Sequence, residues 1–173
     1  MTGSATVDRP HVRLLDWLAR QGIEFEVHRH AEAFTAQASA RAEGVDARTF
    51  AKVVGVTTDG GRRVLLVLDA TDHVDLRKAR EALAARDVRL LSETELADLA
   101  PDCQVGAIPA VGQLFGLPMY ADYAVRDDPA ISFNAGNHHD SVRVERAAWE
   151  RATAVKYADL VEESSRRPAW ARS

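Results

Sequence analysis

The stretch Phe50-Ala51-Lys52-Val53-Val54-Gly55-Val56 is an apolar run that contains a single charge. In a β-strand alternate side chains share a face, so Lys52 is expected on the same face as Phe50, Val54 and Val56. A lysine on an apolar strand face either reaches water at the edge of the sheet or holds an anion in a pocket. Because lysine is rarely fully buried, this stretch alone favours a lysine at the rim.

The strand that carries Lys52 is the first half of a predicted β-hairpin. Asp59-Gly60-Gly61 is typical of a turn, and residues 63–69 predict the returning strand. Further strands are expected at 23–30, 88–91, 119–125, 130–134 and 141–145, and helices at 11–21, 36–43, 75–86, after the capping box 92–95, and at 147–152. Because several neighbouring strands are joined by short turns, we expect a mixed sheet rather than a regular parallel one. The predicted fold is α/β with a mixed α+β order, two-layered or barrel-like.

The length and composition limit the number of domains and the kinds of partner to expect. The chain has 173 residues, a formal net charge of −4 and one cysteine, Cys103. We expect a single domain over 1–173, with an ordered core at about 10–161 and polar tails. A duplex-coating protein would be basic, so DNA is not an expected partner. Neither a membrane span nor a secretory signal is expected, and the chain is expected to be cytoplasmic.

Two loops carry candidate binding groups. Val105-Gly106-Ala107-Ile108-Pro109-Ala110-Val111-Gly112 has two glycines and a proline, which fix the backbone and let a ligand approach its N–H and C=O groups. Asn134-Ala135-Gly136-Asn137-His138-His139-Asp140 follows a predicted strand and is dense in polar groups. An ordinary loop and an ordinary turn are the alternatives, although turn chemistry does not explain two adjacent histidines.

Other chemistries have weaker signals. His28 and His30 share a face of a predicted strand, and with His138, His139 and Asp140 they form a loose zinc-like set, but H-E-x-x-H is absent. Neither a G-x-S-x-G elbow nor a nucleotide-binding glycine motif is present. Cys103 has no activating neighbour in the sequence, which favours a packed thiol. No metal and no cofactor are therefore expected.

In their order and spacing, these segments resemble the YbaK/prolyl-tRNA-synthetase-associated family of aminoacyl-tRNA deacylases, the INS-like editing domains. The resemblance covers roughly residues 21–160. It rests on His28-Arg29-His30-Ala31-Glu32-Ala33-Phe34-Thr35-Ala36, Phe50-Ala51-Lys52, residues 64–69 with Asp75-Leu76-Arg77-Lys78, the 105–112 loop, Tyr120-Ala121-Asp122, and Phe133-Asn134-Ala135-Gly136.

The resemblance implies hydrolysis of the ester that joins a wrong amino acid to the 3′ end of tRNA, on a curved, barrel-like mixed sheet. It also implies that a water attacks the ester without a protein nucleophile, which agrees with the lack of a recognisable triad in the sequence. The resemblance implies Lys52 as the catalytic residue. It also implies a set of substrate-binding residues: Gly106, Ala107, Ile108, Pro109, Gly112, Asn134, Ala135, Gly136, His28, Phe34, Thr35 and His138. The expected partners are the aminoacyl-tRNA acceptor end and an aminoacyl-tRNA synthetase.

Three positions depart from the family pattern. Val53 follows Lys52 where the alanine-specific branch resembles Lys-Asn, Ala110 follows Pro109 where a second proline is frequent, and Asn137 stands where serine is common. The first departure argues against alanyl-tRNA specificity. Two alternative functions stay open: a YbaK-like binding module for a synthetase or an amino-acid-like ligand, and a metal-dependent hydrolase using His28, His30 and His138 or His139.

Overall fold

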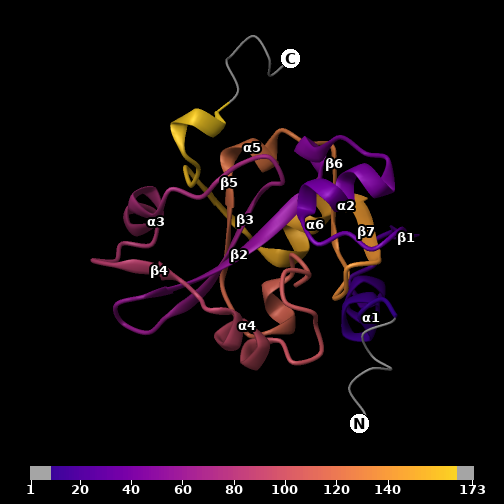
Figure 1. Ribbon diagram of the computed structural model, residues 1–173, viewed down its shortest axis with the longest axis horizontal. Helices are drawn as coiled ribbons and strands as arrows, with labels where there is room; N and C mark the ends of the chain where they lie inside the picture. The colour runs from indigo at the N-terminus through magenta and orange to yellow at the C-terminus, as the bar shows by residue number, and fades with distance from the viewer. Residues whose placement is uncertain (1–8, 167–173) are drawn as a thin grey trace.

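The structure, a computed structural model, describes residues 9–166 (Figure 1). Of the predicted polar tails, the structure describes Arg9 and residues 162–166, and the rest lies outside the described range. Helices and strands interleave along the chain, which confirms the predicted mixed α/β class. The helices are α1 (Val12–Arg20), α2 (Ala36–Glu43), α3 (Leu76–Ala82), α4 (Glu93–Leu99), α5 (Tyr123–Arg126) and α6 (Arg146–Thr153). The strands are β1 (Phe25–Arg29), β2 (Ala51–Thr58), β3 (Arg63–Asp69), β4 (Val88–Leu90), β5 (Met119–Asp122), β6 (Ala130–Asn134), β7 (Asp140–Glu145) and β8 (Lys156–Ala158).

The larger sheet has the order β4-β2-β3-β5-β8. Its centre is the predicted hairpin, in which β2 runs antiparallel to β3 and Lys52 lies opposite Leu68. β5 is parallel to β3, and β8 is parallel to β5, so these three strands end at the same edge of the sheet. The sheet is mixed, as the short turns between several strands predict.

The smaller sheet is antiparallel, with the order β1-β7-β6. A single parallel bridge between Phe50 and Ser132 links it to the start of β2. The strands therefore continue from one sheet to the next, but among the described residues they do not close into a barrel. The main hydrophobic core lies between the sheets and receives side chains from α1 and α6, including Leu14, Leu18 and Trp149.

Local sequence signals set most helix ends. Thr35 accepts the N–H of Ala38, and Gly44 ends α2 with a left-handed backbone at φ 83°. Ser92 and Glu95 form the predicted capping box of α4. No helix in the described part of the chain is long and apolar enough to cross a membrane.

Three element boundaries differ from the sequence-based expectation. The strand expected at 119–125 ends at Asp122, because the Asp122 carboxylate accepts the Ala124 N–H and caps α5. The helix expected at 75–86 stops at Ala82, and Ala84 turns the chain with a positive φ of 51°. Strand β8 was not anticipated, since three residues are too few to show an alternating pattern.

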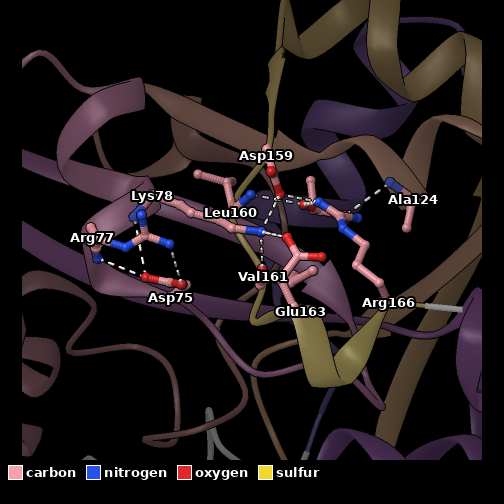
Figure 2. Close-up of polar contacts among 10 residues, drawn as sticks. Asp75, Arg77, Lys78, Ala124, Asp159, Leu160, Val161, Glu163 and Arg166 are labelled. Atoms are coloured by element: carbon pink, nitrogen blue, oxygen red, sulfur yellow. Dashed lines mark hydrogen bonds and ion pairs between the residues drawn. The ribbon is translucent and has the colours of Figure 1, made fainter.

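A polar network fastens the segment after β8 to the sheet (Figure 2). Asp122 is fully buried, and its carboxylate accepts hydrogen bonds from the Leu160 N–H and from both terminal nitrogens of Arg166, the latter at 2.6 and 2.8 Å. Lys78 on α3 donates to Asp159 and to the backbone oxygen of Val161. This end of the chain is therefore held by charged groups that satisfy one another.

Candidate functional site

Lys52 lies in β2 on the face that also carries Phe50, as its position in the sequence predicts. Its side chain is partly buried, and among residues 9–166 no hydrogen bond or ion pair within 4 Å involves its ammonium. Burial lowers the pKa of Lys52, and the negative charge of Asp72 opposes that shift. The ammonium is therefore partly desolvated and available to a negatively polarised ligand.

Asn134 lies on the strand beside Lys52. Phe50, the residue before β2, forms a parallel bridge with Ser132 of β6, and two residues further along the two segments come Lys52 and Asn134. Since alternate residues share a face, this register directs both side chains to one side of the sheet. Asn134 is buried, and its Oδ1 accepts the Ser39 hydroxyl of α2 at 3.2 Å. Lys52 and Asn134 thus lie on the side of the sheet that α2 covers.

The 105–109 loop and the 134–138 turn are hydrogen-bonded to each other. The Gln104 N–H donates to Gly136 O at 2.8 Å, and the Gly136 N–H donates to Ala107 O at 2.9 Å. The side chains of Ala107, Ile108 and Pro109 are buried, so the loop presents mainly backbone. Within residues 9–166 the N–H groups of Gly106 and Ile108 have no acceptor. Such N–H groups can stabilise a developing oxyanion.

His138 packs between this loop and Phe34. Its ring centroid lies 5.0 Å from that of Phe34, and its Cε1 lies 3.5 Å from the position that a Cβ on Gly106 would take. His138 is 7% exposed, and its Nδ1 has no hydrogen-bond partner among the described residues, whereas Phe34 is 67% exposed. An exposed aromatic ring beside a buried imidazole is a surface on which a ligand could rest.

The structure does not bring all of the predicted site residues together. The Thr35 hydroxyl is occupied as the cap of α2. Gly112 closes a tight turn, where a Cβ would lie 2.3 Å from Leu117 O. Ala135 is buried in the main core. His28 lies on β1 beside Glu26 at 3.1 Å and Glu43 at 3.8 Å.

Sequence analysis missed a polar layer beneath α2. Ser141 Oγ donates to Glu43 Oε1 at 3.1 Å, the Glu43 side chain is fully buried, and its Oε2 has no hydrogen-bond partner within residues 9–166. Arg143 donates to the Ser132 hydroxyl at 2.9 Å. Ser39 and Glu43 are four residues apart on an alanine-rich helix, so both lie on one face of it. This spacing is the sequence feature from which a polar helix face could have been predicted.

The histidines do not form the loose metal set considered from the sequence. Among the described residues, the one group with ligand atoms close enough for a metal is His11, Asp102 and Cys103. His11 Nδ1 accepts the Leu14 N–H, so Nε2 carries the proton and donates to Asp102 at 2.7 Å. Arg13 also binds Asp102, and burial raises the pKa of the Cys103 thiol to about 12. This cluster fastens α1 to the loop after α4 through hydrogen bonds to the Asp102 carboxylate.

The chain is similar to a known domain family and to several solved structures. The model of the aminoacyl-tRNA editing domain matches residues 30–152, which is most of the chain. A candidate trans-editing enzyme for prolyl tRNA synthetase has 23% identity and a TM-score of 0.78, covering 87% of this chain and 96% of its own. A hypothetical protein has 18% identity and a TM-score of 0.79 over 87% and 99% of the two chains.

A scaffold protein from computational epitope grafting has 24% identity and a TM-score of 0.77 over 87% and 96% of the two chains. At these identities the solved structures show a common fold. No curated protein sequence matches the chain. The match of the family model over residues 30–152 shows that the chain belongs to the aminoacyl-tRNA editing domain family.

Proposed function

We propose that the protein is a stand-alone deacylase that hydrolyses, in trans, the ester between a wrong amino acid and the 3′ end of tRNA. Family membership supports the editing function. The observation that carries the hydrolytic activity is the partly buried Lys52 ammonium, which has no ion pair within residues 9–166 and lies on the strand that borders Asn134. A desolvated ammonium is a strong donor to a phosphate or a ribose hydroxyl.

The reaction requires three things of the protein. A water must add to the ester carbonyl, the oxyanion that forms must be stabilised, and the ribose oxygen must leave with a proton. The N–H groups of Gly106 and Ile108 are suited to the oxyanion. Lys52 is suited to hold the terminal ribose and its phosphate. No protein nucleophile is proposed, and the Cys103 thiol, with its raised pKa, stays protonated at neutral pH.

The first substrates to test come from the relatives. Because one structural neighbour is described as a candidate trans-editing enzyme for prolyl tRNA synthetase, mischarged tRNA for proline is the first substrate, and that synthetase is the first partner. Pocket shape decides which amino acid is removed, and one methylene changes discrimination by only ~1–3 kcal/mol. A panel of small amino acids on this tRNA is therefore needed.

The test is release of amino acid from that panel by the wild type, Lys52→Ala and Asn134→Ala, with thermal unfolding to confirm that each variant folds. We expect the wild type to hydrolyse at least one mischarged tRNA, and Lys52→Ala to be at least about a hundredfold slower, as for loss of a transition-state donor. Saturable tRNA binding without turnover would instead favour the binding module. Equal activity of wild type and Lys52→Ala would remove Lys52 from the mechanism.

A further inference from the structure

A cavity of about 350 Å³ opens at the edge of the larger sheet, away from the 105–109 loop. Its wall includes Asp72 after β3, Tyr123, Arg126 and Asp127 of the α5 region, and Asp159 after β8. These residues follow the carboxyl ends of three mutually parallel strands. That edge is where ligands bind in open α/β sheets.

One wall residue of the cavity, Asp72, also acts electrostatically on Lys52. Lys52 pairs with Leu68, and Asp72 comes four residues after Leu68, immediately beyond the end of β3. Asp72 lines the cavity, and its negative charge also acts on the Lys52 ammonium. A ligand held by Lys52 could therefore extend a neighbouring part of itself into this cavity.

Two residues that line the cavity, Asp159 and Arg166, belong to a network of charged groups (Figure 2). The Asp122 carboxylate, which caps α5, receives both arms of Arg166, and Arg166 also pairs with Asp159. Lys78 binds Asp159 from the other side at 3.1 Å. Because these charges satisfy one another, Asp159 and Arg166 form a fixed part of the wall, and Tyr123 and Asp127 are the wall groups suited to meet a ligand.

Those remaining groups suit a nucleobase. Tyr123 is 43% exposed, and the Arg126 guanidinium lies 5.0 Å from its ring centroid and 5.7 Å from that of Tyr157. Aromatic rings and guanidinium planes are the surfaces on which unpaired RNA bases stack. Asp127 is exposed and forms no ion pair within the described residues. A carboxylate accepts the exocyclic amino group of cytosine or adenine.

We propose that this cavity binds an unpaired base of the tRNA 3′ end, an adenine or a cytosine, with Tyr123 as the stacking surface and Asp127 as the acceptor of the amino group. The proposal rests on the deacylase function, which places the 3′ end at Lys52. All three terminal bases of tRNA, C, C and A, carry the required amino group. Uracil presents a carbonyl at the corresponding position and would be repelled by the carboxylate.

The test compares Tyr123→Ala with Tyr123→Phe, which keeps the ring, on a mischarged tRNA and on the ethyl ester of the same amino acid, which has no base. We expect Tyr123→Ala to lower kcat/KM on tRNA about tenfold while Tyr123→Phe stays within about twofold, as for loss of one stacked base. Activity on the ethyl ester should be unchanged. Replacing a terminal cytosine of the tRNA by uracil should lower kcat/KM of the wild type by a larger factor than it lowers kcat/KM of Asp127→Ala.

Several outcomes would overturn the proposal. Equal loss of activity by Tyr123→Ala on tRNA and on the ethyl ester, or no loss on either, would exclude a base subsite while leaving the deacylase function intact. If the wild type hydrolyses no substrate at all, calorimetric titration with the trinucleotide CCA decides. Binding that Tyr123→Ala abolishes and Tyr123→Phe retains would support the subsite, and failure of the folded wild type to bind CCA would contradict it.

Discussion

At the scale of single residues, Lys52 is where sequence and structure agree most closely. Strand alternation predicts its face, and the structure leaves it partly buried, intermediate between a solvated rim lysine and a fully enclosed one. Of its neighbours, Asn134 was expected only from the family resemblance, and Asp72 was not expected. Asp72 and Asn134 approach Lys52 through a returning strand and an inter-sheet bridge. No local pattern encodes contacts between residues so far apart in the chain.

The lowered pKa of Lys52 gives a pH prediction. Because burial disfavours its charged form, Lys52 should lose its proton at a pH below the ordinary 10.5. The affinity of the wild type for tRNA that carries no amino acid should then weaken as pH rises from 7 toward 10. Lys52→Arg stays charged in this range and should keep its affinity. Calorimetric titration at several pH values checks this, and parallel pH profiles for the two proteins would contradict it.

At the scale of elements, caps were the most predictable features. Thr35, Gly44 and the Ser92–Glu95 box act as their local sequence indicates. Strand β1 was less predictable: Val27 is 43% exposed although its alternation with glutamates predicts burial. The opposite face of β1, which carries His28, is partly covered instead, because His28 lies beside Glu43 of α2. Burial of a short strand depends on which helix packs over it, and α2 presents polar residues there.

The capping box of α4 gives a second pH prediction. Arg89 and the Ser92 backbone hold the pKa of Glu95 at about 2, below its usual 4.5. A depressed carboxyl pKa contributes stability that is present above the unfolded-state pKa and is lost as pH falls toward 2. Glu95→Gln should therefore be less stable than the wild type at pH 7, with the difference shrinking below pH 4.5. Urea unfolding across pH 2–7 measures it, and a difference independent of pH would contradict the assignment.

At the scale of the whole molecule, composition and turn spacing were enough to predict a mixed α/β domain. The strand order was not predictable, because β5 and β8 join the hairpin by parallel pairing across long connections. The same holds for the buried Asp122, whose partner Arg166 lies 44 residues later. The candidate site follows this division: its loops were visible in the sequence, whereas the cavity beside α5 exists only after the parallel strands assemble.

The Asp122–Arg166 pair is expected to stabilise the whole fold. Arg166→Ala leaves a fully buried carboxylate with only two backbone N–H donors, and we expect a loss of about 2–3 kcal/mol in the free energy of unfolding. Arg151→Ala, an exposed arginine on α6, is the matched control and should change stability by less than about 0.5 kcal/mol. Urea unfolding compares them, and equal effects of the two substitutions would show that the pair is not stabilising.

The central claim, that this editing domain hydrolyses mischarged tRNA through Lys52, is tested most directly by multiple-turnover deacylation. Mischarged tRNA is supplied in large excess over protein, and the released amino acid is measured for the wild type and Lys52→Ala. The account predicts many turnovers per wild-type molecule on at least one substrate and a rate at least about a hundredfold lower for folded Lys52→Ala. Release that never exceeds the uncatalysed rate with any tRNA, or that is equal for both proteins, would contradict it.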